Sequence, residues 1–195
     1  VSRQTYDTDA CVLLKGEPCP GLGIVESGTL KGVRLSLNGR EQILKVFHPG
    51  HAFGTAGIFA EAPNPISVIA LESATVCFID QPSLFHLMER HPPLMQGVVR
   101  QLANRTQELV ELAADLSLRT VEMRLARRLL AEATDGAIRR DRWATQAEMA
   151  ARLGTVVYVL NRALRGLEED GLIQVTRDTI TLLDPDGLRA RALSQ

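Results

Sequence analysis

Residues 11–79 carry short alternations of hydrophobic and polar residues that are broken by glycines. Dipeptides that favour turns close three successive runs: Ser27-Gly28, Asn38-Gly39 and Pro49-Gly50. Turn signals at this spacing favour an antiparallel sandwich or barrel, and Asn-Gly between two alternating runs predicts a hairpin. The run VIALESATVCFID adds a further pair of strands or one long strand. This part of the chain is therefore predicted to be an antiparallel β domain.

Helical periodicity replaces the alternation from Ser83 onward. A first helix, SLFHLMERH, is expected to end at Pro92 and Pro93, because proline cannot continue a helix. A long helix is predicted over residues 94–117, and a heptad seam follows one of its faces: Leu102, Thr106, Leu109, Ala113 and Leu116. Such a seam is typical of two helices packed side by side, so we expect a homodimer. The alternative is that this helix only covers the β domain.

A pair of short helices is predicted within residues 145–173, TQAEMAARLGTVVYVLNRALRGLEEDGLI. It follows a helix over residues 121–133 and a loop, TDGAIRRDRW. Thr145 and Glu148 have the spacing of a capping box, in which the hydroxyl and the carboxylate satisfy amides at the start of a helix. Gly154 supplies a tight turn. Apolar residues at helical spacing are expected to pack the two helices together: Met149, Ala150, Leu153, Val159, Ala163, Leu164 and Leu167.

A hairpin is predicted after this helix pair, with LIQV and TITLLD joined at Arg177 and Asp178. Two helices joined by a glycine-containing turn are typical of a helix-turn-helix motif, whose second helix enters the major groove of DNA. The hairpin would then be a wing that contacts phosphate through Arg177 or Thr176. The alternative is a plain helical hairpin in a small core, which accounts for neither the capping box nor the wing.

The composition limits how such a protein meets DNA. The net charge is −1, so a nucleic-acid surface must be a local basic patch. Apolar residues make up 45% of the chain, which argues against wholesale disorder. No apolar run reaches the roughly 20 residues of a membrane helix. Three cysteines without a CxxC pair favour a reducing compartment. We therefore expect a cytoplasmic protein with no membrane partner.

The order of β-roll, long helix and winged helix-turn-helix resembles the cyclic-AMP receptor protein/FNR family of bacterial transcription factors over nearly the whole chain. In the β part the matching residues are Gly28, Gly39, Arg40, Glu41, Pro49, Gly50, Phe53 and Gly54. In the C-terminal part they are Thr145, Glu148, Gly154, Arg162, Leu167, Gly171, Leu172 and Ile173. The resemblance implies an α+β fold: a jelly-roll, cyclic-nucleotide-binding-like β-roll in residues 1–93, a dimerisation helix in 94–117 and a winged helix-turn-helix in 118–195.

The resemblance implies two partners, double-stranded DNA and a second copy of the chain. RNA polymerase is a further candidate partner. Two recognition helices would enter successive major grooves of an inverted repeat, about 34 Å apart. The N-terminal domain would sense a signal and reorient those helices through the long helix.

By the same resemblance the base-reading positions are Val157, Tyr158 and Arg162. Many relatives carry an arginine and a glutamate at the first two, so only Arg162 keeps a charged reader, and it suits bidentate pairing to guanine. Val156, Val157 and Tyr158 suit contacts to thymine methyl groups. We expect phosphate or outward contacts from a further set: Thr145, Gln146, Thr155, Asn161, Arg165 and Arg177. The alternative for Val157 is a partly inward orientation.

The segment PGHAFGTAGIFAEAPNPISVIA departs from relatives that bind cyclic AMP. Those relatives place a glutamate on the ribose and an arginine on the phosphate, whereas here Thr55 and then Asn64 or Pro65 stand near these positions. Between Arg40 and Asp80 the only cation is Lys45, and a buried phosphate without a cation is poorly compensated. The candidate effector pocket comprises Phe53, Gly54, Thr55, Asn64, Leu109 and Val110. We expect that cyclic AMP does not bind in the usual pocket.

Other sensing chemistries are open but weakly supported. An iron–sulfur cluster needs four thiolates, and Cys11, Cys19 and Cys77 are scattered. Oxidation of Cys11 and Cys19 stays an alternative. His48 and His51, in HPGH, are either solvated loop residues or ligands of a haem or another metal centre. No cofactor is predicted. An unidentified effector, including haem or another small ligand, and a ligand-free DNA binder both stay open.

An enzyme is the competing class of function: a cupin-type, metal-dependent β-barrel with a helical tail, in which His48 and His51 bind the metal. A cupin site uses an HxH pair, a nearby carboxylate and a later histidine, whereas this chain has HxxH with Glu61 as the next acid. No Ser-His-Asp grouping, phosphate loop or paired-carboxylate motif is apparent. We therefore predict no enzyme activity, no catalytic residues and no metal ligands.

Overall fold

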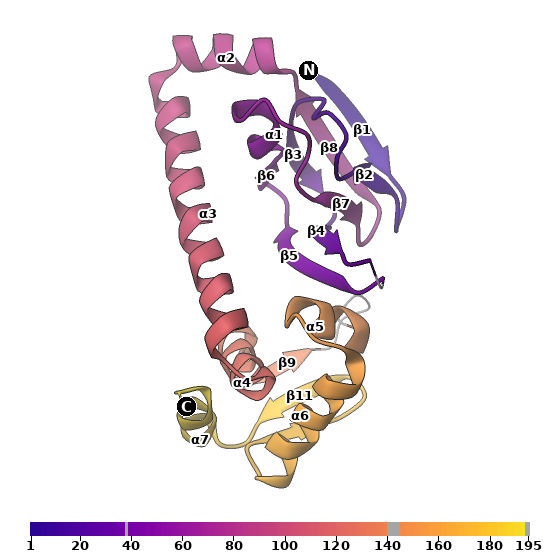
Figure 1. The fold of residues 1–195 in the computed structure, drawn as a ribbon, viewed down its shortest axis with the longest axis vertical. Helices are drawn as coiled ribbons and strands as arrows, with labels where there is room; N and C mark the ends of the chain where they lie inside the picture. Colours follow the sequence, from indigo (N-terminus) through magenta and orange to yellow (C-terminus); the bar gives the residue numbers. More distant parts are fainter. Residues whose placement is uncertain (38, 140–144, 194–195) are drawn as a thin grey trace. The chain divides into compact units, whose positions relative to one another are not determined.

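The computed structural model describes residues 1–37, 39–139 and 145–193 (Figure 1). The chain divides into two compact units, Val1–Gln107 and Glu108–Gln195, and the division falls inside the long helix α3 (Pro92–Leu118). The predicted order of a β domain, a long helix and a helix-turn-helix with a hairpin is confirmed. No helix within the described ranges is both long and apolar enough to cross a membrane.

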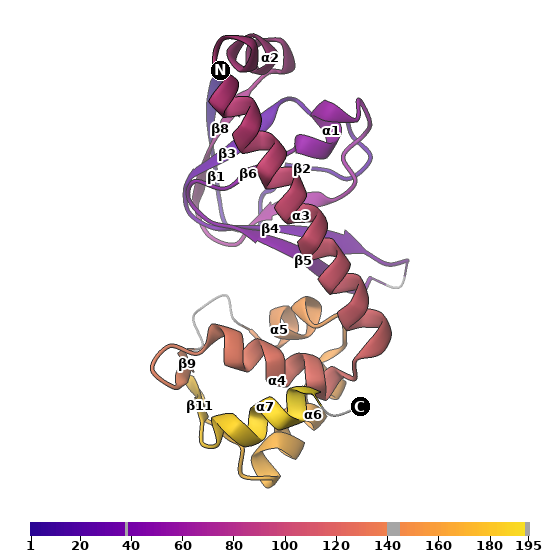
Figure 2. The same cartoon turned by 90° about the vertical axis from the view of Figure 1, so that its left-hand side faces the viewer.

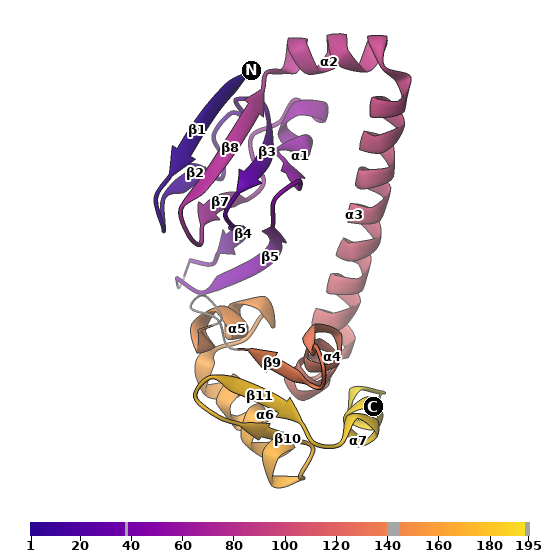
Figure 3. The ribbon, with the colours of Figure 1, turned by 180° about the vertical axis from the view of Figure 1, so that it is seen from behind.

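Two four-stranded antiparallel sheets form the first unit. One sheet has the order β1 (Ser2–Tyr6), β8 (Ala74–Ile79), β3 (Leu22–Ser27) and β6 (Ala52–Phe53). The other has the order β2 (Cys11–Leu13), β7 (Ser67–Ala70), β4 (Leu30–Leu35) and β5 (Glu41–Phe47). Figure 3 shows β1, β8 and β3 side by side. A shared apolar core includes Val25, Leu30, Phe47, Phe53, Val68, Val76 and Phe78.

One feature of this unit was left open by the sequence and one differs from the prediction. The run VIALESATVCFID forms two strands rather than one long strand, and they lie in different sheets, because β7 pairs with β2 and β4 while β8 pairs with β1 and β3. Strand β1 was not predicted, and most of its residues are exposed, so it carries no apolar alternation. The β4–β5 hairpin is confirmed by the pairing from Leu30–Phe47 to Leu35–Glu41, although Asn38 of its turn lies outside the described residues.

Gly28 shows why the turn between two of these strands requires glycine. Its φ is +77°, in the left-handed region that favours glycine. A Cβ at this position would lie 2.4 Å from the carbonyl oxygen of Ser73. The chain therefore passes from β3 towards β4 at a site that only glycine fits.

Helices α1 (Thr55–Phe59) and α2 (Gln81–Arg90) complete the first unit together with the start of α3. The carboxylate of Asp80 caps α2 by accepting a hydrogen bond from the Ser83 amide over 2.9 Å. Helix α3 begins at Pro92, earlier than predicted, because proline is tolerated in the first turn. Val98 is buried with Leu84 in a small apolar cluster that ties α3 to this unit.

The second unit holds the helix-turn-helix and a three-stranded sheet. Its elements are α4 (Val121–Glu132), β9 (Ala137–Arg139), α5 (Gln146–Arg152), α6 (Val157–Glu169), β10 (Ile173–Val175), β11 (Thr179–Leu182) and α7 (Pro185–Leu193). The sheet order β10-β11-β9 adds a strand to the predicted hairpin. Strand β9 falls in the stretch TDGAIRRDRW, which was predicted to be a loop and of which residues 140–144 lie outside the described ranges.

A continuous core fills this unit. It includes Leu125 and Leu129 from α4, Leu160 and Leu167 from α6, and Leu188 from α7. Helix α7 was not predicted, and Figure 2 shows it beside α4. The Arg191 guanidinium of α7 forms ion pairs with Glu122 on α4 and with Asp170 at the end of α6. Helix α7 thus helps to hold α6 in place.

Candidate nucleic-acid interface

The hydroxyl half of the predicted capping box is present at the start of the helix-turn-helix. The Thr145 hydroxyl accepts a hydrogen bond from the Glu148 amide over 3.2 Å, and α5 begins at Gln146. Gly154 has a φ of +66°, and the Thr155 amide then donates to the carbonyl of Ala150 over 2.9 Å. These contacts reverse the chain between α5 and α6.

The inner face of α6 packs into the core. Leu160, Ala163, Leu164 and Leu167 are buried, whereas Val159 is only half-buried. The sequence prediction placed Val159 on this face in the position that Leu160 occupies. Leu160 therefore replaces Val159 in the buried stripe, whereas Ala163, Leu164 and Leu167 are buried as predicted.

The outer face of α6, which we call the reading surface, carries the predicted base-reading residues. Tyr158 is 77% exposed and Val157 is 37% exposed. Arg162 and Arg165 are exposed, and positions three or four residues apart share one side of a helix. Val157 does not belong to the buried core of this unit, so its side chain remains accessible to a ligand. The reading surface is completed at its start by Val156, which is exposed.

Polar side chains at the helix starts behave in two ways. Gln146 is exposed at the start of α5, and its side-chain oxygen accepts a hydrogen bond from the Asn161 amide over 3.3 Å. Thr145 is exposed beside it. Thr155 differs from the prediction of a phosphate contact, because it is buried and its backbone holds the turn.

The wing hairpin is fixed to α6 by a contact that the sequence did not suggest. The Glu168 carboxylate accepts a hydrogen bond from the Val175 amide over 2.9 Å. At the tip, the Thr176 hydroxyl accepts a hydrogen bond from the Thr179 amide over 3.0 Å. Arg177 lies between these anchored residues and is exposed. The wing therefore presents its arginine from a turn that these hydrogen bonds hold.

Charge is distributed unevenly along α6. Its first turn carries no acidic residue, and the positive end of the helix dipole lies there. Glu168, Glu169 and Asp170 stand at the opposite end. The reading surface is thus favourable to an anion at its start, although the chain as a whole is close to neutral.

The predicted seam on α3 is exposed along its length. Leu102, Leu109 and Leu116 are 37–44% exposed. Thr106 and Ala113 between them are also exposed. The other side of α3 in the first unit is attached to the sheets, because Gln101 donates to the carbonyl of Ala52 and Arg105 donates to that of Leu44, over 3.2 and 3.3 Å. The helix therefore covers the β domain with one face and leaves the seam free.

The candidate effector residues are divided between the two units. Phe53 is buried in the core, with its ring centroid 5.4 Å from that of Phe47. Asn64 is also buried, and its side-chain amide donates to the carbonyl of Pro18 over 3.4 Å. Leu109 and Val110 lie in the second unit and are exposed.

A cation from a distant part of the sequence lies near this segment. The Arg34 guanidinium, from β4, donates to the carbonyl of Pro65 over 2.9 Å. Pro65 is one of the two positions that stand near the phosphate-binding arginine of relatives that bind cyclic AMP. Arg34 is distant from Pro65 in the sequence and reaches it from another strand, so a local sequence pattern does not reveal the contact.

The structure adds little support for the cysteines or for His48 and His51 as sensing residues. The three cysteines are free thiols, and burial raises the pKa of Cys19, which reduces its fraction of reactive thiolate. The rings of His48 and His51 lie 5.7 Å apart, and the His51 imidazole accepts a hydrogen bond from the His48 amide. Across the described part of the chain, no group of three or more His, Cys, Asp or Glu residues is arranged to hold a metal.

Comparison with known families matches both units. Residues 3–91 match the cyclic nucleotide-binding domain family, and residues 123–191 match the Crp-like helix-turn-helix domain family. These matches agree with the β-roll and with the winged helix-turn-helix. The second match includes the reading surface and the wing.

Similar proteins cover nearly the whole chain. A CRP-like cAMP-activated global transcriptional regulator of Mycobacterium tuberculosis is 29% identical over 187 residues, which are 93% of this chain and 84% of that protein. The cyclic AMP receptor protein of Thermus thermophilus is 26% identical and is matched over 82% of its length by 91% of this chain. The structure of FixK2 from Bradyrhizobium japonicum shares the fold, with a TM-score of 0.82 at 19% identity over 100% of this chain and 98% of that one. The chain therefore belongs to the cyclic-AMP receptor protein/FNR family of transcription regulators, which are DNA-binding proteins rather than enzymes.

Proposed function

We propose that this regulator binds an inverted repeat as a cytoplasmic homodimer and presents one α6 helix to each half-site. The observation that carries the proposal is the division of α6 into two faces. Its buried leucines fix the helix, and the opposite side exposes Val157, Tyr158 and Arg162. A helix held in this way fits the major groove, which is about 12 Å wide.

Recognition at each half-site would combine one charged reader with apolar contacts. Arg162 pairs with the O6 and N7 atoms of a guanine, and Val156, Val157 and Tyr158 contact thymine methyl groups. Thr145, Gln146, Asn161, Arg165 and Arg177 contact phosphates or line the outer side of the motif. A single charged reader predicts a more permissive operator than one read by several charged side chains.

Dimerisation would bury the seam on α3. Five residues that repeat in heptads are exposed in the single chain: Leu102, Thr106, Leu109, Ala113 and Leu116. Exposed leucines at this spacing are typical of a two-stranded coiled coil. Two such chains would place their reading surfaces about one helical repeat of DNA apart.

The signal that controls DNA binding would not be cyclic AMP in the usual pocket. Thr55 offers no carboxylate for a ribose, and Asn64 is committed to the carbonyl of Pro18. Gly54 stays a candidate residue for binding a different small ligand, haem included, or the protein binds DNA without one. RNA polymerase is a further proposed partner on the strength of the family resemblance alone.

The test is selection of bound sequences from random DNA, run with and without an extract of cell metabolites. The expected result is an inverted repeat with one guanine and several thymines in each half-site. Sedimentation of the purified protein should give twice the chain mass of 21.3 kDa. A monomer that enriches no symmetric sequence would overturn the proposal.

A further inference from the structure

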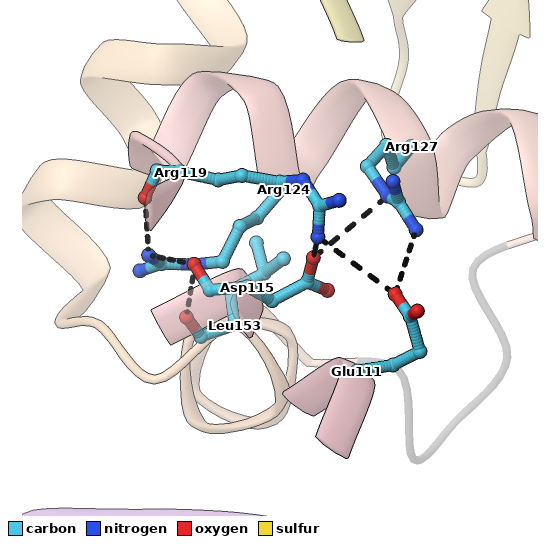
Figure 4. Close-up of polar contacts among 6 residues, drawn as sticks. All are labelled: Glu111, Asp115, Arg119, Arg124, Arg127 and Leu153. Atoms are coloured by element: carbon cyan, nitrogen blue, oxygen red, sulfur yellow. Dashed lines mark hydrogen bonds and ion pairs between the residues drawn. The ribbon is translucent and has the colours of Figure 1, made fainter. Parts of the chain in front are cut away.

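Arg124 on α4 joins two parts of the second unit that are far apart in the sequence. Its Nε donates to the carbonyl of Leu153, at the end of α5, over 3.0 Å. Its Nη1 donates to the carbonyls of Arg119 and Asp115, at the end of α3, over 2.8 and 3.3 Å. Figure 4 shows the guanidinium extending between these backbone oxygens. One side chain thus contacts both the long helix and the turn of the helix-turn-helix.

The chemistry of the two ends explains why a cation stands there. The last carbonyl groups of a helix lack partners within the helix and carry the negative end of its dipole. Asp115 lies in the last turn of α3, and Leu153 follows the last residue of α5. Burial lowers the pKa of Arg124 and nearby Asp115 raises it, but an arginine keeps its charge at neutral pH. The guanidinium therefore satisfies two helix ends together.

Neighbouring ion pairs do not make this connection. Arg127 lies 3.7 Å from Glu111 and 3.8 Å from Asp115, and Arg119 also pairs with both carboxylates. These contacts join α3 to α4 and to the residue between them, and Glu111 is 65% exposed. None of these ion pairs reaches α5 or the turn that follows it. Among these three arginines, Arg124 is the one that contacts the turn within the described part of the chain.

We infer that Arg124 is a positioning residue that fixes the angle between the dimer seam and the reading surface. The inference rests on the proposed homodimer, in which Leu109, Ala113 and Leu116 pack against the partner. Asp115 lies in the same turns of α3 as Ala113 and Leu116. The Arg124 guanidinium therefore makes a direct hydrogen-bonded connection from the turns of the seam to the α5–α6 turn, and it touches no base in the proposed complex.

The consequence is selectivity for the spacing between half-sites. Adding one base pair at the centre of an inverted repeat moves one half-site along the DNA and rotates it around the axis. A dimer whose reading surfaces are fixed relative to each other cannot fit both the shift and the rotation. A dimer whose α5–α6 turn is less firmly held to α3 can adjust to them. Arg124→Met should therefore reduce the ratio of the dissociation constants for the lengthened and original sites by about tenfold, the factor expected from losing a hydrogen bond to a charged donor.

Two further variants separate position from charge. Arg128→Met, one helical turn away, removes the same charge, and within the described residues the ion pair it loses is the one to Glu132 on the same helix, so it should keep the spacing ratio of the parent. Arg124→Lys keeps the charge, yet its single nitrogen cannot replace the two separate nitrogens that reach α3 and α5. Arg124→Lys should therefore lower the spacing ratio as Arg124→Met does. It tests the same prediction if the methionine variant does not fold.

The experiment measures binding of all four proteins to the selected site and to versions lengthened or shortened by one base pair. Sedimentation and thermal melting of each protein establish that it is a folded dimer. A folded Arg124 variant with the spacing ratio of the parent would overturn the inference while leaving the proposed function intact. A parent protein that ignores the spacing would overturn the proposed function and this inference with it.

Discussion

The side-chain amide of Asn161 lies 3.3 Å from the side-chain oxygen of Gln146, and this hydrogen bond joins the reading helix α6 to the first residue of α5. Gln146 is exposed where the positive end of α5 favours a phosphate oxygen. The bond therefore holds a proposed phosphate contact in place before DNA arrives. Its removal separates the contribution of positioning from that of base reading.

Asn161→Ala should weaken binding to all duplexes by a similar factor. The expected loss is about 0.5–1.5 kcal/mol, the net value of one hydrogen bond. The measurement compares the selected site with a scrambled duplex at one salt concentration. Because a phosphate contact carries no sequence information, the ratio of the two affinities should stay constant. A loss confined to the selected site would assign Asn161 to base reading instead.

Arg162→Ala should change the preference for one DNA sequence over another, unlike Asn161→Ala. Losing a bidentate contact to guanine is expected to cost about 1–3 kcal/mol at the selected site and to relax the preference at one base pair. A competition assay with all four bases at each position of a half-site would identify that base pair. Arg165→Ala is the matched control on the same face, and it should weaken binding without changing the preferred sequence. An unchanged base profile for Arg162→Ala would contradict its reading role.

Leu109→Lys should dissociate the dimer, because it places charges from both chains against each other in an apolar seam. Val110→Lys is the control, since Val110 is 62% exposed and lies beside the seam rather than on it. Sedimentation at micromolar concentration should give a monomer for the first variant and a dimer for the second. Equal masses for the two variants would place the interface elsewhere.

Cyclic AMP should give no heat of binding in a calorimetric titration at micromolar protein. Thr55 supplies no carboxylate, and the guanidinium of Arg34 already donates to the carbonyl of Pro65. A saturating signal would show that the pocket is functional. Repeating the titration with Arg34→Ala would then test whether this arginine neutralises the phosphate.

Cys19 should react with iodoacetamide more slowly in the folded protein than in urea at pH 8. Burial raises its pKa, so the folded state holds less thiolate at that pH, and the difference should narrow as the pH rises. The Cys19 thiol also donates to the carbonyl of Gly21 over 3.2 Å. Mass spectrometry of peptides after timed quenching follows the modification. Equal rates in the two states would revive Cys19 as a redox sensor.

The sequence predicts most of the fold because the signals are local. The hairpin of β4 and β5 follows from a glycine turn between alternating runs, and the helix-turn-helix follows from Thr145, Glu148 and Gly154. Strand β9 has three residues and exists because it pairs with Thr179–Thr181, which a local pattern cannot reveal. Helix α7 buries only Leu188 and Ala192, so its amphipathic pattern is weak.

The candidate site could be predicted only as far as its exposed face. Tyr158 and Arg162 are exposed as expected, since the helix period determines which residues share a face. The sequence predicts Phe53 and Asn64 as pocket residues because of the motif in which they stand. The structure buries them, and they contact Phe47 and Pro18. Arg34 and Arg124 act through residues far away in the sequence, and no spacing rule identifies such contacts.

The separation of the two faces of α6 also bears on how such regulators diverge. Substitutions at Val157, Tyr158 or Arg162 alter no buried leucine, so a lineage can try new operators at little cost in folding stability. Substitutions at Leu160 or Leu167 would instead destabilise the fold, so selection would remove them whichever DNA sequence the protein binds. The protein is therefore free to acquire new target genes while its scaffold stays constant.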